Sequence, residues 1–235
     1  MSALDSLLAP DRLVDLTQPL GPGTPLWPGS TPFAATIVAD HDTHGGYARE
    51  LAVPEHAGTH LDAPAHFARG GVTCDAVPLG TLVRPAVKLD VRSLVAGDAD
   101  FALGAAEIRQ LEARDGHIPA GSAVLVQTGW DAYLGVPERY GAGDPPAFPG
   151  LAVDAAQLLV DRGVAGIGID TLGVDPGWAA DFPAHRVTLA AGLWHLEGLV
   201  GLEGVSARGA WLVAAPLRLV GGSGAPARVL AILPA

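Results

Sequence analysis

Apolar positions along this chain fall in short runs that are rich in β-branched side chains and are separated by glycine and proline. Runs of this kind, bounded by turn-forming residues, are typical of buried strands. They predict strands at Phe33–Val38, Pro85–Val91, Ala123–Gln127, Val164–Ile169 and Ala210–Val220. The 31 glycines and 20 prolines are spread along the whole chain, which favours many short elements joined by tight turns.

Two stretches depart from the strand pattern and predict helices. In residues 104–114, Ile108 and Leu111 recur at helical spacing. The apolar run of residues 153–162 ends just before Gly163, which suits a helix C-cap. Since predicted strands outnumber predicted helices, the expected fold class is mixed α/β or α+β and rich in strands.

Composition supports one domain with a substantial core. Of the 235 residues, 49% are apolar and 17% are charged, so the prediction is a single domain spanning residues 1–235. The formal charge of −11 leaves no basic stripe to neutralise phosphates, which argues against a nucleic-acid partner or an anionic membrane. Residues 137–150 form the longest evident loop, for which a lid and a plain surface excursion are both open.

Three features of the sequence that bear on cellular location are consistent with a soluble cytoplasmic protein. The single cysteine, Cys74, cannot form an intramolecular disulfide. The N-terminus has no early Lys or Arg before its first apolar stretch, so it is not typical of a signal peptide. No run approaches about 18 uninterrupted apolar residues, so no membrane partner is expected.

The strongest chemical signal is a cluster of three histidines and one aspartate within residues 56–66. Imidazole and carboxylate donors suit Zn²⁺, Mn²⁺ or Fe²⁺. On a straight strand the step from His56 to His60 would span roughly 13 Å, too far for both to reach one ion. We therefore expect the chain to bend at Gly58. His66 follows Asp62 by four residues, near the ion but not on it, where a general acid or base would stand.

A second group of candidate ligands lies in an otherwise apolar stretch near residue 190. Glu197 there is either exposed on an edge strand or paired with positive charge, because a lone buried carboxylate is costly. His195 would share a strand face with Glu197, so spacing alone leaves His185 and His195 as competing ligands. Asp170 and Asp175 follow a predicted strand, and both site and turn roles are open for them.

The run from His56 to Phe67 resembles the H-x-G-T-H-x-D-A-P-x-H-F signature of the metal-dependent cyclase-like hydrolases, which include bacterial kynurenine formamidases and isatin hydrolases. Segments 13–17, 25–29, 164–171 and 221–228 add weaker likenesses. The resemblance implies a swivelling β/β/α domain that assembles as a homodimer or homotetramer. Positions 59, 67 and 173 differ from the formamidase branch, so the family is better indicated than the substrate.

The resemblance also implies a set of metal ligands, of Zn²⁺ or Mn²⁺, with one or two ions. By this likeness one ion is held by His56, His60 and Asp62, and a second, where present, by Asp62, His185 and Glu197. The family pattern thus favours His185 over His195 as a ligand.

In the same pattern His66 is the acid/base residue and Trp27 lines the substrate pocket. The function expected is hydrolysis of a carbon–nitrogen amide bond, cyclic or acyclic, in a small aromatic molecule such as an N-formyl arylamine or isatin. The ion would supply hydroxide at neutral pH, with His66 as general acid/base. The alternatives are a lactonase, dehydratase or polyketide-type cyclase on the same site, and a non-catalytic metal-binding module.

Overall fold

The computed structural model describes residues 9–234. Residues 1–8 and residue 235 lie outside the described residues. The prediction that the N-terminus is not a signal peptide falls largely on residues 1–8. No helix in the described part of the chain combines the length and the apolar character needed to cross a membrane.

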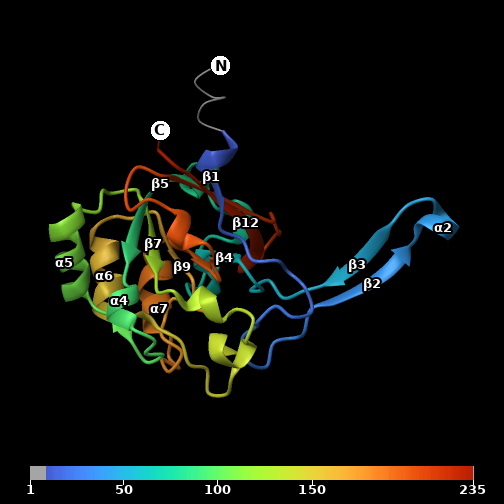
Figure 1. The fold of residues 1–235 in the computed structure, drawn as a ribbon, viewed down its shortest axis with the longest axis horizontal. Helices are drawn as coiled ribbons and strands as arrows, with labels where there is room; N and C mark the ends of the chain where they lie inside the picture. The colour runs from blue at the N-terminus through green and yellow to red at the C-terminus, as the bar shows by residue number, and fades with distance from the viewer. Residues whose placement is uncertain (1–8, 235) are drawn as a thin grey trace.

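Most strands of the described chain join one sheet that closes on itself (Figure 1). In spatial order its strands are β1 (Leu13–Asp15), β12 (Gly224–Ile232), β11 (Trp211–Pro216), β5 (Val83–Asp90), β7 (Ala123–Gln127), β9 (Gly166–Ile169), β10 (Trp194–Glu197) and β4 (His60–Asp62). Strand β4 also pairs with β12, and this second pairing closes the sheet. The central strands β5, β7, β9 and β10 are parallel, and the remaining neighbours are antiparallel.

Two further strand pairs and several helices complete the fold. The pairs are β2 (Ala34–Ala39) with β3 (Ala48–Ala52), and β6 (Ala102–Leu103) with β8 (Gly150–Leu151). The α-helices are α2 (His41–His44), α3 (Leu79–Leu82), α4 (Arg92–Val95), α5 (Ala105–Asp115), α6 (Val153–Asp161) and α7 (Pro183–Ala190). Short 3₁₀ turns are η1 (Pro10–Arg12), η2 (Pro64–His66), η3 (Cys74–Ala76), η4 (Trp130–Tyr133) and η6 (Leu202–Gly204), and η5 (Glu138–Ala142) is a π-helical turn.

The core lies on both faces of the parallel strands. Every residue of β7 is buried, as expected where a parallel strand is covered on both sides. Val124 and Val126 face a layer containing α5 and α6, while Leu125 faces the apolar interior of the closed sheet. Figure 1 shows α5, α6 and α7 together on one side of the sheet. This arrangement confirms the predicted mixed, strand-rich α/β fold.

The predicted elements recur with shifts of a few residues at their ends. Gly163 adopts a φ of +67° just after α6, as the C-cap prediction required. The sequence interpretation missed α7, which begins at Pro183. The loop 137–150 is more than a surface excursion, since Tyr140 and Phe148 are fully buried in the core.

Strands β2 and β3 form an arm that projects from the body of the molecule (Figure 1). Every residue of β3 is exposed, and so are the first five of β2. Isolated two-stranded hairpins are marginal in water, so the arm gains little from the core of its own chain.

Candidate metal centre

The first candidate ligands are brought together by a bend in front of β4. Gly58 has a φ of +62°, a conformation that side chains other than glycine rarely adopt, and this confirms the predicted bend. A Cβ there would also lie 3.3 Å from atoms of Leu20 and Thr24. The bend lets His56 return to the strand, where its Nδ1 lies 2.7 Å from Asp62 Oδ1.

The second candidate ligands lie on β10, the neighbour of β4. In the antiparallel register His195 is opposite Asp62, and Glu197 is opposite His60. Because β10 lies between β4 and β9, Glu197 is not on an edge strand, and only 4% of its surface is exposed. The reading of Glu197 as an exposed edge residue is therefore wrong, and the reading as a buried, paired carboxylate is right.

His185 reaches the same point from the first turns of α7. Its Nδ1 lies 2.6 Å from Asp175 Oδ2, which also accepts the backbone N–H of His185. Asp175 Oδ1 accepts the backbone N–H of Ala184 at 2.7 Å. Asp175 thus caps the start of the helix and directs the His185 ring, leaving Nε2 pointed at the cluster.

Asp62 lies between two groups of donors, with one carboxylate oxygen toward each. Its Oδ1 is 2.7 Å from His56 Nδ1 and 3.3 Å from His60 Nε2. Its Oδ2 is 3.3 Å from His185 Nε2, which is 3.1 Å from Glu197 Oε1. The two groups also touch directly, since His60 Nε2 is 3.4 Å from Glu197 Oε2. We call them the outer group (His56, His60, Asp62) and the inner group (Asp62, His185, Glu197).

The protein fixes the outer imidazoles from behind. His60 Nδ1 donates to the carbonyl of Gly58 at 3.0 Å, so Nε2 is the ring nitrogen that faces the carboxylates. The Ser223 hydroxyl donates to Glu55 and accepts from His56 Nε2, at 2.7 and 2.9 Å. These contacts set which ring nitrogen is available to a ligand.

Burial and the opposed charges shift the pKa values of the cluster strongly. Burial acts to lower the pKa of His60, but the carboxylates of Asp62 and Glu197 outweigh it and raise that pKa to about 10. Burial and the charge of Asp62 act to raise the pKa of Glu197, but His185 and His60 lower it to about 2. Two buried carboxylates therefore keep their negative charge among the imidazoles, an environment that favours a cation.

The donor set fits a divalent metal ion. His60 Nε2 and Asp62 Oδ2 are buried without a hydrogen-bond partner in the described part of the chain, although they lie at the centre of the cluster. Buried polar atoms are rarely left unpaired, and a metal ion bound at the centre of the cluster would pair with both of these atoms. The nitrogen and oxygen donors, without thiolate, suit Zn²⁺ or Mn²⁺.

His66 lies beside the outer group, at the end of the η2 turn. Its ring stacks on His56 with a centroid distance of 4.0 Å, and it is partly exposed. Burial lowers the pKa of His66 to about 4, so the ring is neutral at pH 7.

Aromatic side chains form a wall next to His66. Trp27 contacts Phe182 at a centroid distance of 5.4 Å, and Phe182 contacts Phe67 at 5.3 Å. Phe67 in turn lies 4.9 Å from the His185 ring. Phe182 has a φ of +51°, an uncommon conformation for a bulky residue, and such strain often occurs at functional sites. All three wall residues are partly exposed, and Trp27 also packs against the buried ring of Phe148 in the core.

The structure brings every sequence-predicted site residue into this region, and it adds residues that the sequence left open or missed. The sequence left the role of Asp175 open, because its hydrogen bond to His185 is visible only in the folded structure. Ser223 gave no signal, since it lies far along the chain from His56. His195 is buried next to the inner group, and its ring and the three side chains of that group offer ligand atoms within 4.8 Å of one another.

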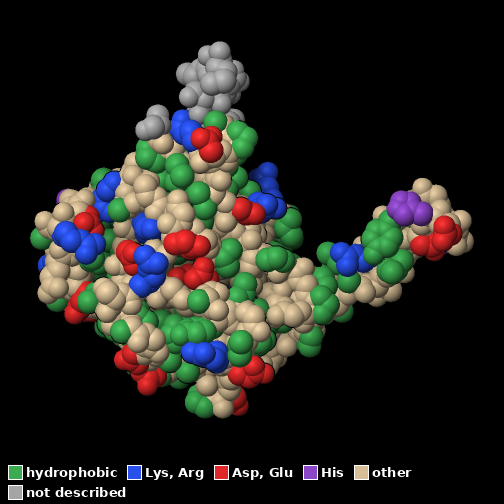
Figure 2. Space-filling view, in the orientation of Figure 1, with side chains coloured by type: hydrophobic (Ala, Val, Ile, Leu, Met, Phe, Trp, Pro, Cys, Tyr) green, Lys and Arg blue, Asp and Glu red, His purple; other side chains and the backbone are tan. Residues whose placement is uncertain are grey.

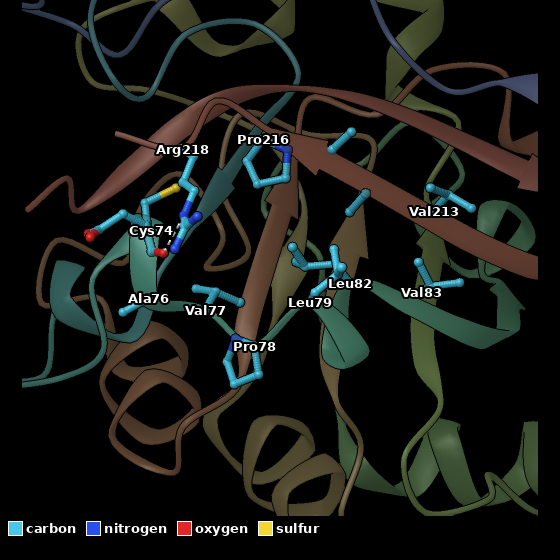
Figure 3. Close-up of a pocket in the computed structure, with 13 residues that line it drawn as sticks. Cys74, Ala76, Val77, Pro78, Leu79, Leu82, Val83, Val213, Pro216 and Arg218 are labelled. Atoms are coloured by element: carbon cyan, nitrogen blue, oxygen red, sulfur yellow. Dashed lines mark hydrogen bonds between the residues drawn. The ribbon is translucent and has the colours of Figure 1, made fainter. Parts of the chain in front are cut away.

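A separate apolar groove lies on the side of β11 and α3 (Figure 3). It has a volume of about 610 Å³, and its walls include Val77, Leu79, Leu82 and Val213. None of the candidate ligands lines it. The groove is therefore distinct from the metal-binding cluster.

Comparisons with known proteins agree with the geometry. The family described as putative cyclase matches residues 14–176. Isatin hydrolase of Roseibium aggregatum is 34% identical over 95% of this chain and 92% of its own length. Kynurenine formamidase of Salinibacter ruber is 32% identical over 93% of this chain and 96% of its own.

Solved structures agree as well. The crystal structure of an isatin hydrolase bound to the product analogue thioisatinate superposes with a TM-score of 0.91 at 31% identity, covering all of both chains. A predicted metal-dependent hydrolase from Bacillus stearothermophilus gives a TM-score of 0.73 at 30% identity, over 93% of this chain and 97% of its own.

Proposed function

This chain belongs to the cyclase family of metal-dependent hydrolases, and we propose that it hydrolyses a carbon–nitrogen amide bond in a small aromatic substrate. The observation that carries the proposal is the buried cluster of imidazole and carboxylate donors, with unpaired atoms at its centre, beside a partly exposed histidine and an aromatic wall. Residues, fold and family all support the same chemistry.

In this proposal the outer group and the inner group hold the divalent metal, with Asp62 common to both. When bound, the metal lowers the pKa of water and polarises the substrate carbonyl. Asp175 and the Gly58 carbonyl keep the rings of His185 and His60 oriented toward it. Because Asp62 has one oxygen toward each group, we propose two ion positions.

His66 acts as the general acid/base. Its neutral ring accepts a proton from the attacking water and returns it to the leaving nitrogen, a role worth roughly 10² to 10⁴-fold in rate. Its stacking on His56 holds the ring within reach of the outer group. Trp27, Phe67 and Phe182 bind an aromatic ring and exclude water from it.

The first substrate to test is isatin, a cyclic aromatic amide. The relatives named isatin hydrolase include one that is 34% identical and one that superposes with a TM-score of 0.91. An N-formyl arylamine is the second candidate, because kynurenine formamidases are 29–32% identical. Ring opening of isatin can be followed by the loss of its visible absorbance.

The decisive experiment combines metal restoration with a His66 variant. Chelator-treated protein should be inactive and should regain isatin hydrolysis with Zn²⁺ or Mn²⁺, and elemental analysis gives the identity and number of the ions. His66→Gln should retain the metal and lose at least about 100-fold in kcat. His44→Gln, an exposed histidine on the arm, is the matched control and should be fully active.

Turnover of lactones but not of amides by the metal-loaded protein would contradict the proposal and favour the lactonase alternative. Wild-type activity in His66→Gln would remove the assigned role of His66 while leaving the amidohydrolase function in place. Metal binding without turnover of any substrate in the panel would favour a non-catalytic module.

We further propose that the chain forms a homodimer or homotetramer through its arm. Ile37 and Leu51 share one face of the arm and are 60% and 56% exposed. Figure 2 shows hydrophobic side chains along the arm, away from the body of the molecule. This face continues into a groove of about 590 Å³ at the base of the arm, lined in part by Leu217 and Leu219. Exposed apolar area of this kind is typical of a protein interface.

Light scattering on a sizing column tests the assembly. The wild-type protein should elute at two or four times the 23.9 kDa chain mass. The double variant Ile37→Asp and Leu51→Asp should shift to the monomer. Thr36→Lys, on the opposite face of β2, should leave the assembly intact. A monomeric wild type would contradict the proposal.

A further inference from the structure

His195 is fully buried on β10, and its neighbours assign its two ring nitrogens. Nε2 lies 2.7 Å from the hydroxyl oxygen of Thr188. That hydroxyl has one hydrogen, and it donates it to the carbonyl of Ala184 at 2.7 Å, one turn back in α7. The Thr188 oxygen therefore accepts from His195, so Nε2 carries the ring hydrogen and Nδ1 has a lone pair.

The lone pair of His195 is directed into the metal-binding cluster. Nδ1 lies 3.8 Å from Asp62 Oδ2, too far for a hydrogen bond. Both atoms are buried without a hydrogen-bond partner in the described part of the chain. Two unpaired acceptors that face each other in a buried site repel, and a cation placed between them satisfies both.

We propose that His195 is an additional protein ligand to the ion of the inner group, with its ring held in the ligating tautomer by Thr188. This rests on the proposed metal-dependent function. The four residues Asp62, His185, His195 and Glu197 offer ligand atoms within 4.8 Å of one another, all from buried side chains.

A fourth ligand gives the two ion positions different roles. Four protein ligands are typical of closed, structural metal sites, whereas catalytic sites keep a position open for water or substrate. The inner position is the closed one, surrounded by buried side chains. The outer position has three protein ligands, borders the partly exposed His66 and is where the substrate amide binds.

Metal-binding measurements on two variants test the role of His195. His195→Leu removes the donor, and Thr188→Val removes the hydroxyl while keeping a β-branched shape. Competition with a chelator should show that His195→Leu weakens binding of one of two Co²⁺ ions by at least about 100-fold, and Thr188→Val by about 10-fold. The visible spectrum of the Co²⁺ protein should change in both, because an imidazole ligand is lost or misdirected. His44→Leu is the control and should bind Co²⁺ as the wild type does.

Circular dichroism verifies that each variant is folded, and Thr188→Val carries the test if His195→Leu does not fold. Wild-type Co²⁺ affinity and spectrum in the folded variants, together with loss of Co²⁺ binding in Asp62→Asn, would overturn the role of His195 and leave the proposed function standing. Wild-type binding in Asp62→Asn as well would overturn the proposed function itself, and the role of His195 with it.

Discussion

Replacing Asp175 with asparagine tests whether the orientation of His185 controls metal binding. The carboxylate accepts three hydrogen bonds, one at Oδ1 from Ala184 and two at Oδ2 from the backbone and ring of His185. An amide keeps the shape but has one acceptor oxygen. Whichever way it is turned, its NH₂ group faces at least one N–H donor.

The magnitude follows from these contacts. At least one hydrogen bond to a charged acceptor is lost, worth about 1.5–3 kcal/mol, and the others weaken because the charge is gone. We expect Asp175→Asn to lower the free energy of unfolding by about 2–4 kcal/mol. Because an outer partner of a ligating histidine is altered, metal affinity should fall about 10 to 100-fold.

Urea unfolding in the presence of a chelator measures the stability change without the metal, and chelator competition measures metal affinity. Asp154→Asn is the matched control, since Asp154 accepts the backbone N–H groups of Ala105 at the start of α5 and of Ala155 in the first turn of α6, away from the candidate ligands. It should lower stability slightly and leave metal affinity unchanged. Metal affinity within twofold of wild type in Asp175→Asn, alongside lower stability, would refute the orienting role and reduce Asp175 to a helix cap.

Three further outcomes are expected. Gly58→Ala should lower the free energy of unfolding by about 1–3 kcal/mol and reduce metal content, because the residue needs a positive φ; unchanged urea midpoint and metal content would contradict this. Hydrogen bonding to Arg162 lowers the pKa of Glu112 from 4.5 to about 2. The ionised carboxylate therefore stabilises the fold by about 2–3 kcal/mol above pH 4.5, and this contribution is lost as the pH falls toward 2. Urea unfolding should show the gap between wild type and Glu112→Gln shrinking as pH is lowered from 6 to 3, and a constant gap would refute the assignment. Trp27→Ala should raise KM for an aromatic amide about tenfold while metal content is unchanged, whereas an unaltered KM would exclude Trp27 from the aromatic wall that binds substrate.

Much of the fold was predictable because local patterns match local structure. The continuous apolar run of β7 and the glycine after α6 are signals that depend on neighbours in sequence. Helix α7 was missed because its eight residues follow Phe182 in a left-handed conformation, which no local pattern marks. Only the first strand of the arm was predicted, at residues 33–38, and its partner β3 was missed. The projection of the arm from the body depends on the absence of packing partners in the described part of the chain.

The candidate site likewise has one part that the sequence predicts and one part that depends on the tertiary structure. Sequence by itself determined the donor types and the first three candidate ligands, because His56, His60 and Asp62 stand in one short motif bent by Gly58. Only the tertiary structure decided the rest. The pairing of β4 with β10 places Glu197 and His195 against Asp62, although more than a hundred residues separate them in the chain. Whether a histidine can ligate depends on which ring nitrogen its neighbours protonate, and those neighbours meet only in the folded protein.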